Sequence, residues 1–190
     1  MLSRRLTEML PIETLMQEHR LIERMISQMR KELITMKSTN EVNSKFIDVA
    51  VDFVRVYADR CHHGKEEGVL FRELSIKPMS SEHAVMMREL IDEHVYARRT
   101  TGNLVKAKER YIKGDDEARS DVWKLLNDLV EFYPRHIEKE DKKFFYPSMS
   151  YFNQSEQETM LNEFSDFDRK IVHEHYAKVL DALEKTDTEV

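Results

Sequence analysis

Two pairs of side chains in this sequence combine a histidine with a glutamate four residues later: His62 with Glu66, and His136 with Glu140. Residues four apart in an α-helix lie on the same face, so each pair would present an imidazole and a carboxylate in the same direction. Imidazole and carboxylate together suit iron, manganese or zinc. Because a carboxylate has two oxygens, either glutamate could bridge two ions. The spacing therefore indicates metal chemistry.

The same stretches belong to an internal repeat. The segment LMQEH, which ends at His19, returns 75 residues later as LIDEH, which ends at His94. The segment HHGKEEGVLF, which begins at His62, returns 74 residues later as HIEKEDKKFF, which begins at His136. Each half of the repeat thus carries a lone histidine followed by a His-x-x-x-Glu pair. This arrangement predicts two helical hairpins related by a pseudo-twofold axis.

A single histidine on an apolar helix face is usually a core residue with a hydrogen-bond partner. A histidine–glutamate pair on such a face is costly unless it is paired or binds a metal, and here the pair occurs twice in register. We therefore predict a centre that holds two metal ions. Its six expected ligands are His19, His62, Glu66, His94, His136 and Glu140.

Two further positions leave alternatives open. His63 and Glu67 form a second pair, rotated by about 100° from the first, so either register could face the metals. The repeat favours His62 and Glu66, which leaves His63 beside the site or on the surface. His175 lies on the apolar face of the last helical segment. Its alternative roles are a core or lid residue and a fifth histidine ligand. The remaining histidines, which we expect to be exposed, are His83 and His173.

Other polar residues lie close to the expected ligands. Glu18 and Glu93 each precede a lone histidine, and we expect them to point outward or to form salt bridges, unless they support a ligand. Three tyrosines lie near the same level and could hydrogen-bond a bound oxygen species, although packing is the simpler interpretation. They are Tyr57, Tyr96 and Tyr133.

Long helices must position these residues, because glycine and proline are scarce, with 4 of each in 190 residues. Apolar residues recur with a helical period in several segments. Their expected ranges are about 11–36, 40–74, 82–113, 115–146 and 155–185. Asn40 is the expected N-cap of the second helix. Pro134 is expected to kink the fourth.

Short connections between these segments predict an all-α fold, an up-down-up-down four-helix bundle with an additional C-terminal helix. The bundle would span residues 11–146, and residues 147–190 would pack on the same domain, outside the bundle or over its end. In this topology the first and third helices begin at the end of the bundle where the second and fourth helices finish. The six ligands should therefore meet at one level, toward one end of the bundle.

Composition narrows the functional classes. A length of 190 residues fits one domain. The net charge of −6 gives no basic surface for nucleic acid. The single cysteine, Cys61, excludes an internal disulfide, fits a reducing compartment and is expected to be a packed thiol. The start, MLSRRLTEML, lacks the apolar run of a signal peptide, and no segment is apolar enough to span a membrane. We expect a cytoplasmic protein.

The motif pattern resembles the hemerythrin-like, or HHE cation-binding, family over residues 11–145. The resemblance rests on the segments EHRLIERM, HHGKEEGVLF, DEHVYARR and HIEKEDKKFFYP, the last with one residue more between histidine and glutamate than the family's usual pattern. It implies a four-helix bundle with a non-haem di-iron centre held by the six residues above, with zinc or manganese as alternatives. Oxygen-carrying hemerythrins use five histidines. Four are found here, which is more similar to iron–sulfur-cluster repair proteins and iron-sensing domains.

The leading functional interpretation is a di-iron protein that binds or senses a small oxidant, such as dioxygen, peroxide or nitric oxide. Alternatives are an oxidoreductase that handles peroxide or nitric oxide, an iron donor or store for the repair of iron centres, and a helical interaction protein without metal. The sequence leaves open whether the protein is an enzyme, because these classes share their ligands. We expect a small diatomic or peroxide ligand as its partner, and neither nucleic acid nor a membrane, while the sequence leaves a protein partner unknown.

Overall fold

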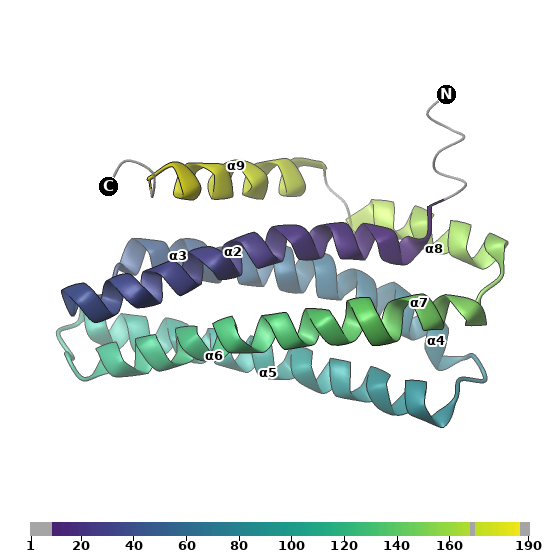
Figure 1. Cartoon of the computed structure of the whole chain (residues 1–190), viewed down its shortest axis with the longest axis horizontal. Coiled ribbons are helices and arrows are strands. Elements are labelled where there is room, and N and C mark those ends of the chain that lie inside the picture. Colours follow the sequence, from purple (N-terminus) through teal and green to yellow (C-terminus); the bar gives the residue numbers. More distant parts are fainter. Residues whose placement is uncertain (1–8, 168–169, 187–190) are drawn as a thin grey trace.

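The computed structural model describes residues 9–167 and 170–186, and over these ranges the chain is helical without a β-strand (Figure 1). The predicted all-α fold is confirmed. Long antiparallel helical stretches form a bundle. Its first stretch is α2 (Pro11–Thr39) and its third is α5 (Ser81–Ile112). The second and fourth stretches are each built from several helices in succession.

Both composite stretches contain π-helices. The second comprises α3 (Ser44–Phe53), the π-helices η1 (Val54–His63) and η2 (Glu66–Phe71), and α4 (Arg72–Ser75). The fourth comprises α6 (Ala118–Lys139), the π-helix η3 (Glu140–Phe144), α7 (Phe145–Ser148) and the 3-10 turn η4 (Met149–Tyr151). Such π segments are rare and occur frequently at functional sites. Here they carry most of the histidines and glutamates that the sequence singles out on these two stretches: His62, His63, Glu66, Glu67 and Glu140. The exception, His136, lies in the last turn of α6.

The ends of the helices follow local chemistry, with one correction to the prediction. Asn40 is not the N-cap of the second stretch; it ends α2 in the left-handed conformation, with φ of 61°. Asparagine tolerates this conformation at a helix C-terminus. Asn43 provides the N-cap instead, because its side chain accepts a hydrogen bond from the backbone of Phe46. Ser80 caps α5, because its side chain accepts a hydrogen bond from the backbone of His83. Helix α6 runs through Pro134 without a break, and the kink expected there stays a prediction.

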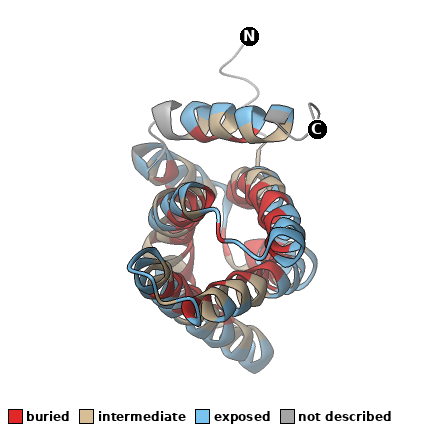
Figure 2. Ribbon diagram, turned by 90° about the vertical axis from the view of Figure 1, so that its left-hand side faces the viewer, coloured by how far each residue is buried: buried red, intermediate tan, exposed pale blue. Residues whose placement is uncertain are grey.

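Buried residues line the inward faces of the long helices (Figure 2). Their apolar side chains form two clusters. The larger cluster includes Ile22, Val54, Leu129 and Tyr133. The smaller includes Ile12, Leu15, Leu70 and Phe144. Along each helix, the predicted ligands fall between residues of the two clusters. The predicted metal level is therefore a polar layer between two apolar layers, and the smaller cluster closes the near end of the bundle.

The C-terminal region differs from the prediction of one helix, because it forms α8 (Gln154–Phe167) and α9 (Lys170–Thr186). Helix α8 packs against α2 and η2, and α9 packs against α2 and η1. Phe164 of α8 is buried in the smaller apolar cluster, and Tyr176 of α9 in the larger. Both helices thus complete the core. The division of the chain after residue 146 stays a prediction, and residues 1–8, 168–169 and 187–190 lie outside the described residues.

Candidate metal centre

The six predicted ligands converge at one level of the bundle, together with His63. Their ligand atoms form two groups, and the atoms of each group lie within 4.8 Å of one another. The first group is His19, His62, Glu66 and Glu140, and the second is His63, His94 and His136. All seven side chains are buried, with at most 2% of their surface exposed. The four long stretches each contribute at least one of them.

The two glutamates connect the groups. One carboxylate oxygen of Glu66 lies 3.6 Å from Nε2 of His62, and the other lies 3.3 Å from Nε2 of His94. One oxygen of Glu140 lies 3.2 Å from Nε2 of His19, and the other lies 3.3 Å from Nε2 of His136. Each carboxylate therefore faces one histidine of each group, which is the placement that a bridging ligand needs.

The atoms that face the centre have no hydrogen-bond partner among the described residues. They are Nε2 of His19, His62, His94 and His136, and all four carboxylate oxygens of Glu66 and Glu140. Leaving a buried polar atom unpaired costs about 1–3 kcal/mol, so native proteins rarely leave so many together. Four nitrogens and four oxygens suit two borderline or hard cations. The residues present therefore fit a pair of metal ions.

The electrostatics of the layer favour positive charge. Burial alone would lower the pKa of His19, but its hydrogen bond with Asp141 and the nearby Glu140 carboxylate raise it to about 10. Burial likewise opposes protonation of His94, while the nearby carboxylates of Glu140 and Glu66 and the hydrogen bond with Glu67 raise its pKa to about 11. Burial would raise the pKa of Glu140, yet the facing histidines hold it well below its usual value. Without metal, protons on histidine balance the carboxylates.

Four carboxylates outside the centre orient the histidines through their other ring nitrogen. Nδ1 of His62 lies 2.9 Å from Glu18, and Nδ1 of His136 lies 2.8 Å from Glu93. Nδ1 of His94 lies 2.6 Å from Glu67, and Nδ1 of His19 lies 2.7 Å from Asp141. A carboxylate can only accept, so Nδ1 donates and the Nε2 lone pair is left for a metal.

Each of these carboxylates also pairs with a basic side chain. The pairs are Glu18 with Lys65, Glu93 with Lys139, Glu67 with Arg98, and Asp141 with Arg20. Burial opposes ionisation of the three glutamates, but the hydrogen bonds from histidine and the basic groups lower the pKa of each. The three glutamates therefore stay charged, and all four carboxylates hold the imidazoles in one tautomer. Glu18 and Glu93 thus form salt bridges, as one of the expectations had it, and they also take the alternative supporting role beside a histidine. Glu67 shares this role, because it contacts the outer nitrogen of His94.

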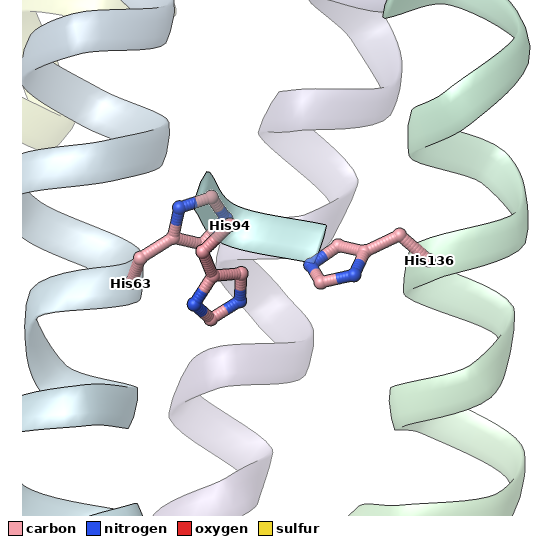
Figure 3. Close-up of side chains that lie close together, drawn as sticks. All are labelled: His63, His94 and His136. Atoms are coloured by element: carbon pink, nitrogen blue, oxygen red, sulfur yellow. The ribbon is translucent and has the colours of Figure 1, made fainter. Parts of the chain in front are cut away.

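His63 is the exception in the layer. It lacks a hydrogen-bonded carboxylate, since Asp59 lies 3.5 Å from its Nδ1 without hydrogen-bond geometry and neither ring nitrogen is paired among the described residues. Its ring stacks on that of His94, with centroids 3.8 Å apart and planes 11° from parallel (Figure 3). A metal lies in the plane of the imidazole that binds it, and two parallel rings cannot both satisfy this for one ion. Burial and the adjacent histidines lower the pKa of His63, so it is neutral.

A family model described as the hemerythrin HHE cation-binding domain matches residues 10–146. The chain belongs to this family. No curated protein and no solved structure matches it significantly. The match covers the bundle and every residue of the polar layer, so the resemblance drawn from the motifs is confirmed at the level of the family.

Three histidines of this hemerythrin-family chain do not lie where the sequence suggested. His83 is half-buried instead of exposed, and its Nδ1 lies 2.8 Å from the hydroxyl of Tyr151. His175 is exposed on α9, beside Tyr176, and the structure does not bring it to the centre. His173 is half-buried instead of exposed. Its Nδ1 lies 3.0 Å from the hydroxyl of Tyr57, and its Nε2 lies 3.5 Å from Glu18. The helical period predicted that His175 faces the bundle, whereas His173 does.

Two other expectations concern the tyrosines and the cysteine around the centre. Tyr133 is fully buried, whereas Tyr96 lines a surface groove beside His136. Cys61 is buried as expected, with its sulfur facing the backbone of Phe167 and not the centre.

No helix in the described part of the chain is both long and apolar enough to cross a bilayer. Sequence reasoning missed Asp141, although the repeat signals it, because it matches Glu67 at the same position of the other half.

Proposed function

We propose that this chain is a non-haem di-iron protein of the hemerythrin family that binds or senses a small oxidant, such as dioxygen, peroxide or nitric oxide. One ion would be held by His19 and His62, and the other by His94 and His136. Glu66 and Glu140 would bridge the two. The observation that carries the proposal is a set of eight buried nitrogen and oxygen atoms that have no hydrogen-bond partner among the described residues and could bind metal. Four of these atoms face each of the two proposed ion positions.

The number of protein ligands supports binding of a small molecule. Each ion would have two nitrogens and one oxygen from each glutamate, which leaves coordination positions for an external ligand. Iron bound there would supply reversible redox chemistry. The donor set contains no thiolate, which fits iron or manganese, and the family resemblance favours iron.

The surroundings support a resident centre more than an iron store. The ligand nitrogens are fixed by carboxylates that are themselves paired with lysine or arginine. Apolar clusters lie on both sides of the layer and limit access of water. A store must release its iron readily, whereas this arrangement would retain it.

The test is to load the metal-free chain with ferrous iron under anaerobic conditions, determine iron per chain, and record absorption spectra with dioxygen, peroxide or nitric oxide. The proposal expects a charge-transfer band that forms with dioxygen or nitric oxide and is lost when the gas is removed. Turnover of peroxide faster than by free iron would favour the oxidoreductase, and rapid transfer of iron to an apo acceptor would favour the donor. A matched pair of variants separates specific from adventitious binding: His62→Ala should lose iron, and His175→Ala should not.

A further inference from the structure

A small cavity adjoins the polar layer on one side. Its volume is about 110 Å³, which is room for a few water-sized molecules. It lies between η1, α5 and α6, and its lining includes Val54, Asp59, His63, Ala97, Thr101 and Tyr133. The cavity therefore reaches the one histidine of the layer that has no supporting carboxylate.

Tyr133 brings an unused hydrogen-bond donor to this cavity. The side chain is 1% exposed, and its hydroxyl has no hydrogen-bond partner in the part of the chain that the structure describes. Burial and the nearby Asp59 carboxylate raise the pKa of Tyr133, so the hydroxyl keeps its proton. A buried hydroxyl without a hydrogen-bond partner is unfavourable, which indicates that a small molecule in the cavity accepts its hydrogen bond. Thr101 is already satisfied, because its hydroxyl donates to the carbonyl of Ala97.

The internal repeat breaks where this cavity lies. In the other half, the positions that match Ala97 and Thr101 are Ile22 and Ile26, and the position that matches His63 is Ile137. All three isoleucines are buried, with 1%, 5% and 4% of their surface exposed. Large apolar side chains thus occupy the pseudo-twofold counterpart of the cavity. One side of the metal layer is packed, and the other has small residues, a histidine and a tyrosine.

Charge at the cavity wall disfavours cations. Arg98 lines it and donates to Asp59 at 2.6 Å and to Glu67 at 2.7 Å. Exposed Arg55 contributes a second guanidinium. Since Glu67 holds Nδ1 of His94, the wall is also linked directly to a ligand of the centre. A neutral or anionic molecule that accepts hydrogen bonds matches these surroundings.

We propose that this cavity is the binding pocket and access route for the small ligand, that Tyr133 and His63 hold the ligand by hydrogen bonds, and that His63 is not itself a metal ligand. The proposal rests on the proposed function, because it needs a metal pair with a position open to an external ligand. The stacking of His63 on His94 supports the last part, since these two rings cannot share an ion in this arrangement.

The test uses azide, a small anion that accepts hydrogen bonds, added to the iron-loaded full chain. Tyr133→Phe and His63→Leu should keep two irons per chain and raise the azide dissociation constant about fivefold each, the equivalent of a hydrogen bond of ~1 kcal/mol. His63→Gln, which can still donate, should restore part of the affinity. Ala97→Leu fills the pocket and should slow azide association without changing iron content. Tyr96→Phe, which removes a hydroxyl from the groove on another face, is the control.

A second measurement separates ligand binding from a structural role of Tyr133. Because its hydroxyl has no partner, the metal-free Tyr133→Phe chain should melt at the same or a higher temperature than the unaltered metal-free chain. A lower melting temperature would show that the hydroxyl stabilises the fold and would overturn its assigned role.

The remaining outcomes are also decisive. Loss of an iron from both His63 variants would make His63 a metal ligand. Unchanged azide affinity in Tyr133→Phe would mean that the hydroxyl contacts only water, and unchanged association in Ala97→Leu would place the route elsewhere. Each result overturns the pocket while the proposed function stands. If the iron-loaded chain binds neither azide nor nitric oxide, both proposals fail.

Discussion

Glu67 in the first hairpin accepts a hydrogen bond of 2.6 Å from Nδ1 of His94 in the second. Its counterpart Asp141, in the second hairpin, accepts one of 2.7 Å from His19 in the first. The other two supporting carboxylates, Glu18 and Glu93, act within their own hairpins. The outer carboxylates therefore orient the ligands and also join the two halves of the bundle at the metal layer.

This cross-connection predicts that Glu67→Gln weakens metal binding. The amide keeps the shape of the side chain but loses the charge that fixes the His94 tautomer, and replacing such a partner typically costs about 10–100-fold in metal affinity. Competition with a chelator of known affinity measures the change. Glu138→Gln, which removes an exposed carboxylate paired with Lys142, is the matched control. Equal affinities for both variants would show that the outer carboxylate does not support the ligand.

His173 should influence how firmly the centre holds its metal. It contacts Glu18, which orients His62, so His173→Ala removes a neighbour of that carboxylate. We expect iron to transfer to a chelator several-fold faster than from the unaltered chain. His175→Ala alters an exposed residue two positions away on α9 and should leave the rate unchanged. Equal rates for the two variants would exclude a role of His173 in retaining metal.

Metal loading should stabilise the fold. Buried histidines and carboxylates lose their unpaired atoms when a cation binds them, and an ion that binds only the folded chain shifts unfolding by mass action. Thermal melts of the iron-loaded chain should lie several degrees above those of the metal-free chain. The shift should shrink in Glu140→Ala, which removes a bridging carboxylate. Coincident melts of the loaded and metal-free chains would contradict the prediction.

The metal-free chain should lose stability as the pH rises above neutral. The pKa of His19 is raised from 6.5 to about 10 in the fold, and that of His94 to about 11. A group with a raised folded pKa stabilises fully below its unfolded pKa, and this contribution is lost as the pH rises through the folded value. Melting temperatures of the metal-free chain should therefore fall between pH 6.5 and about 10. The iron-loaded chain, whose histidines carry metal in place of protons, should change less over that range, and parallel curves would contradict this account.

The repeat and the helical period were enough to predict the bundle and the convergence of the six ligands. His62 and Glu66 lie on one face whatever the details of packing, and chain direction sets their level against His19. The same rules failed where local geometry departs from a regular α-helix. The π-helices of the second and fourth stretches leave no periodic signal, and the exchange of Asn40 for Asn43 as the N-cap depends on the turn between helices.

Side-chain details could not be read from spacing. Both His62 and His63 are buried, but only ring orientation distinguishes their roles, and no sequence pattern encodes a stacking angle. Glu67 could equally have been a ligand, and its link to His94 requires the distance between two helices. Whether the hydroxyl of Tyr133 has a hydrogen-bond partner depends on neighbours from three stretches, which sequence spacing does not place. For α9, a small rotation about the helix axis decides whether His173 or His175 faces the bundle.

Iron stoichiometry of the reconstituted chain tests the central claim most directly. Metal-free protein is loaded anaerobically with ferrous iron, freed of excess metal, and analysed for iron against protein concentration, beside the Glu66→Ala and His175→Ala variants. The account predicts two irons per chain, both retained in His175→Ala and at least one lost in Glu66→Ala. One iron or none in the unaltered chain, or two in Glu66→Ala, would contradict a metal pair bridged by the two buried glutamates.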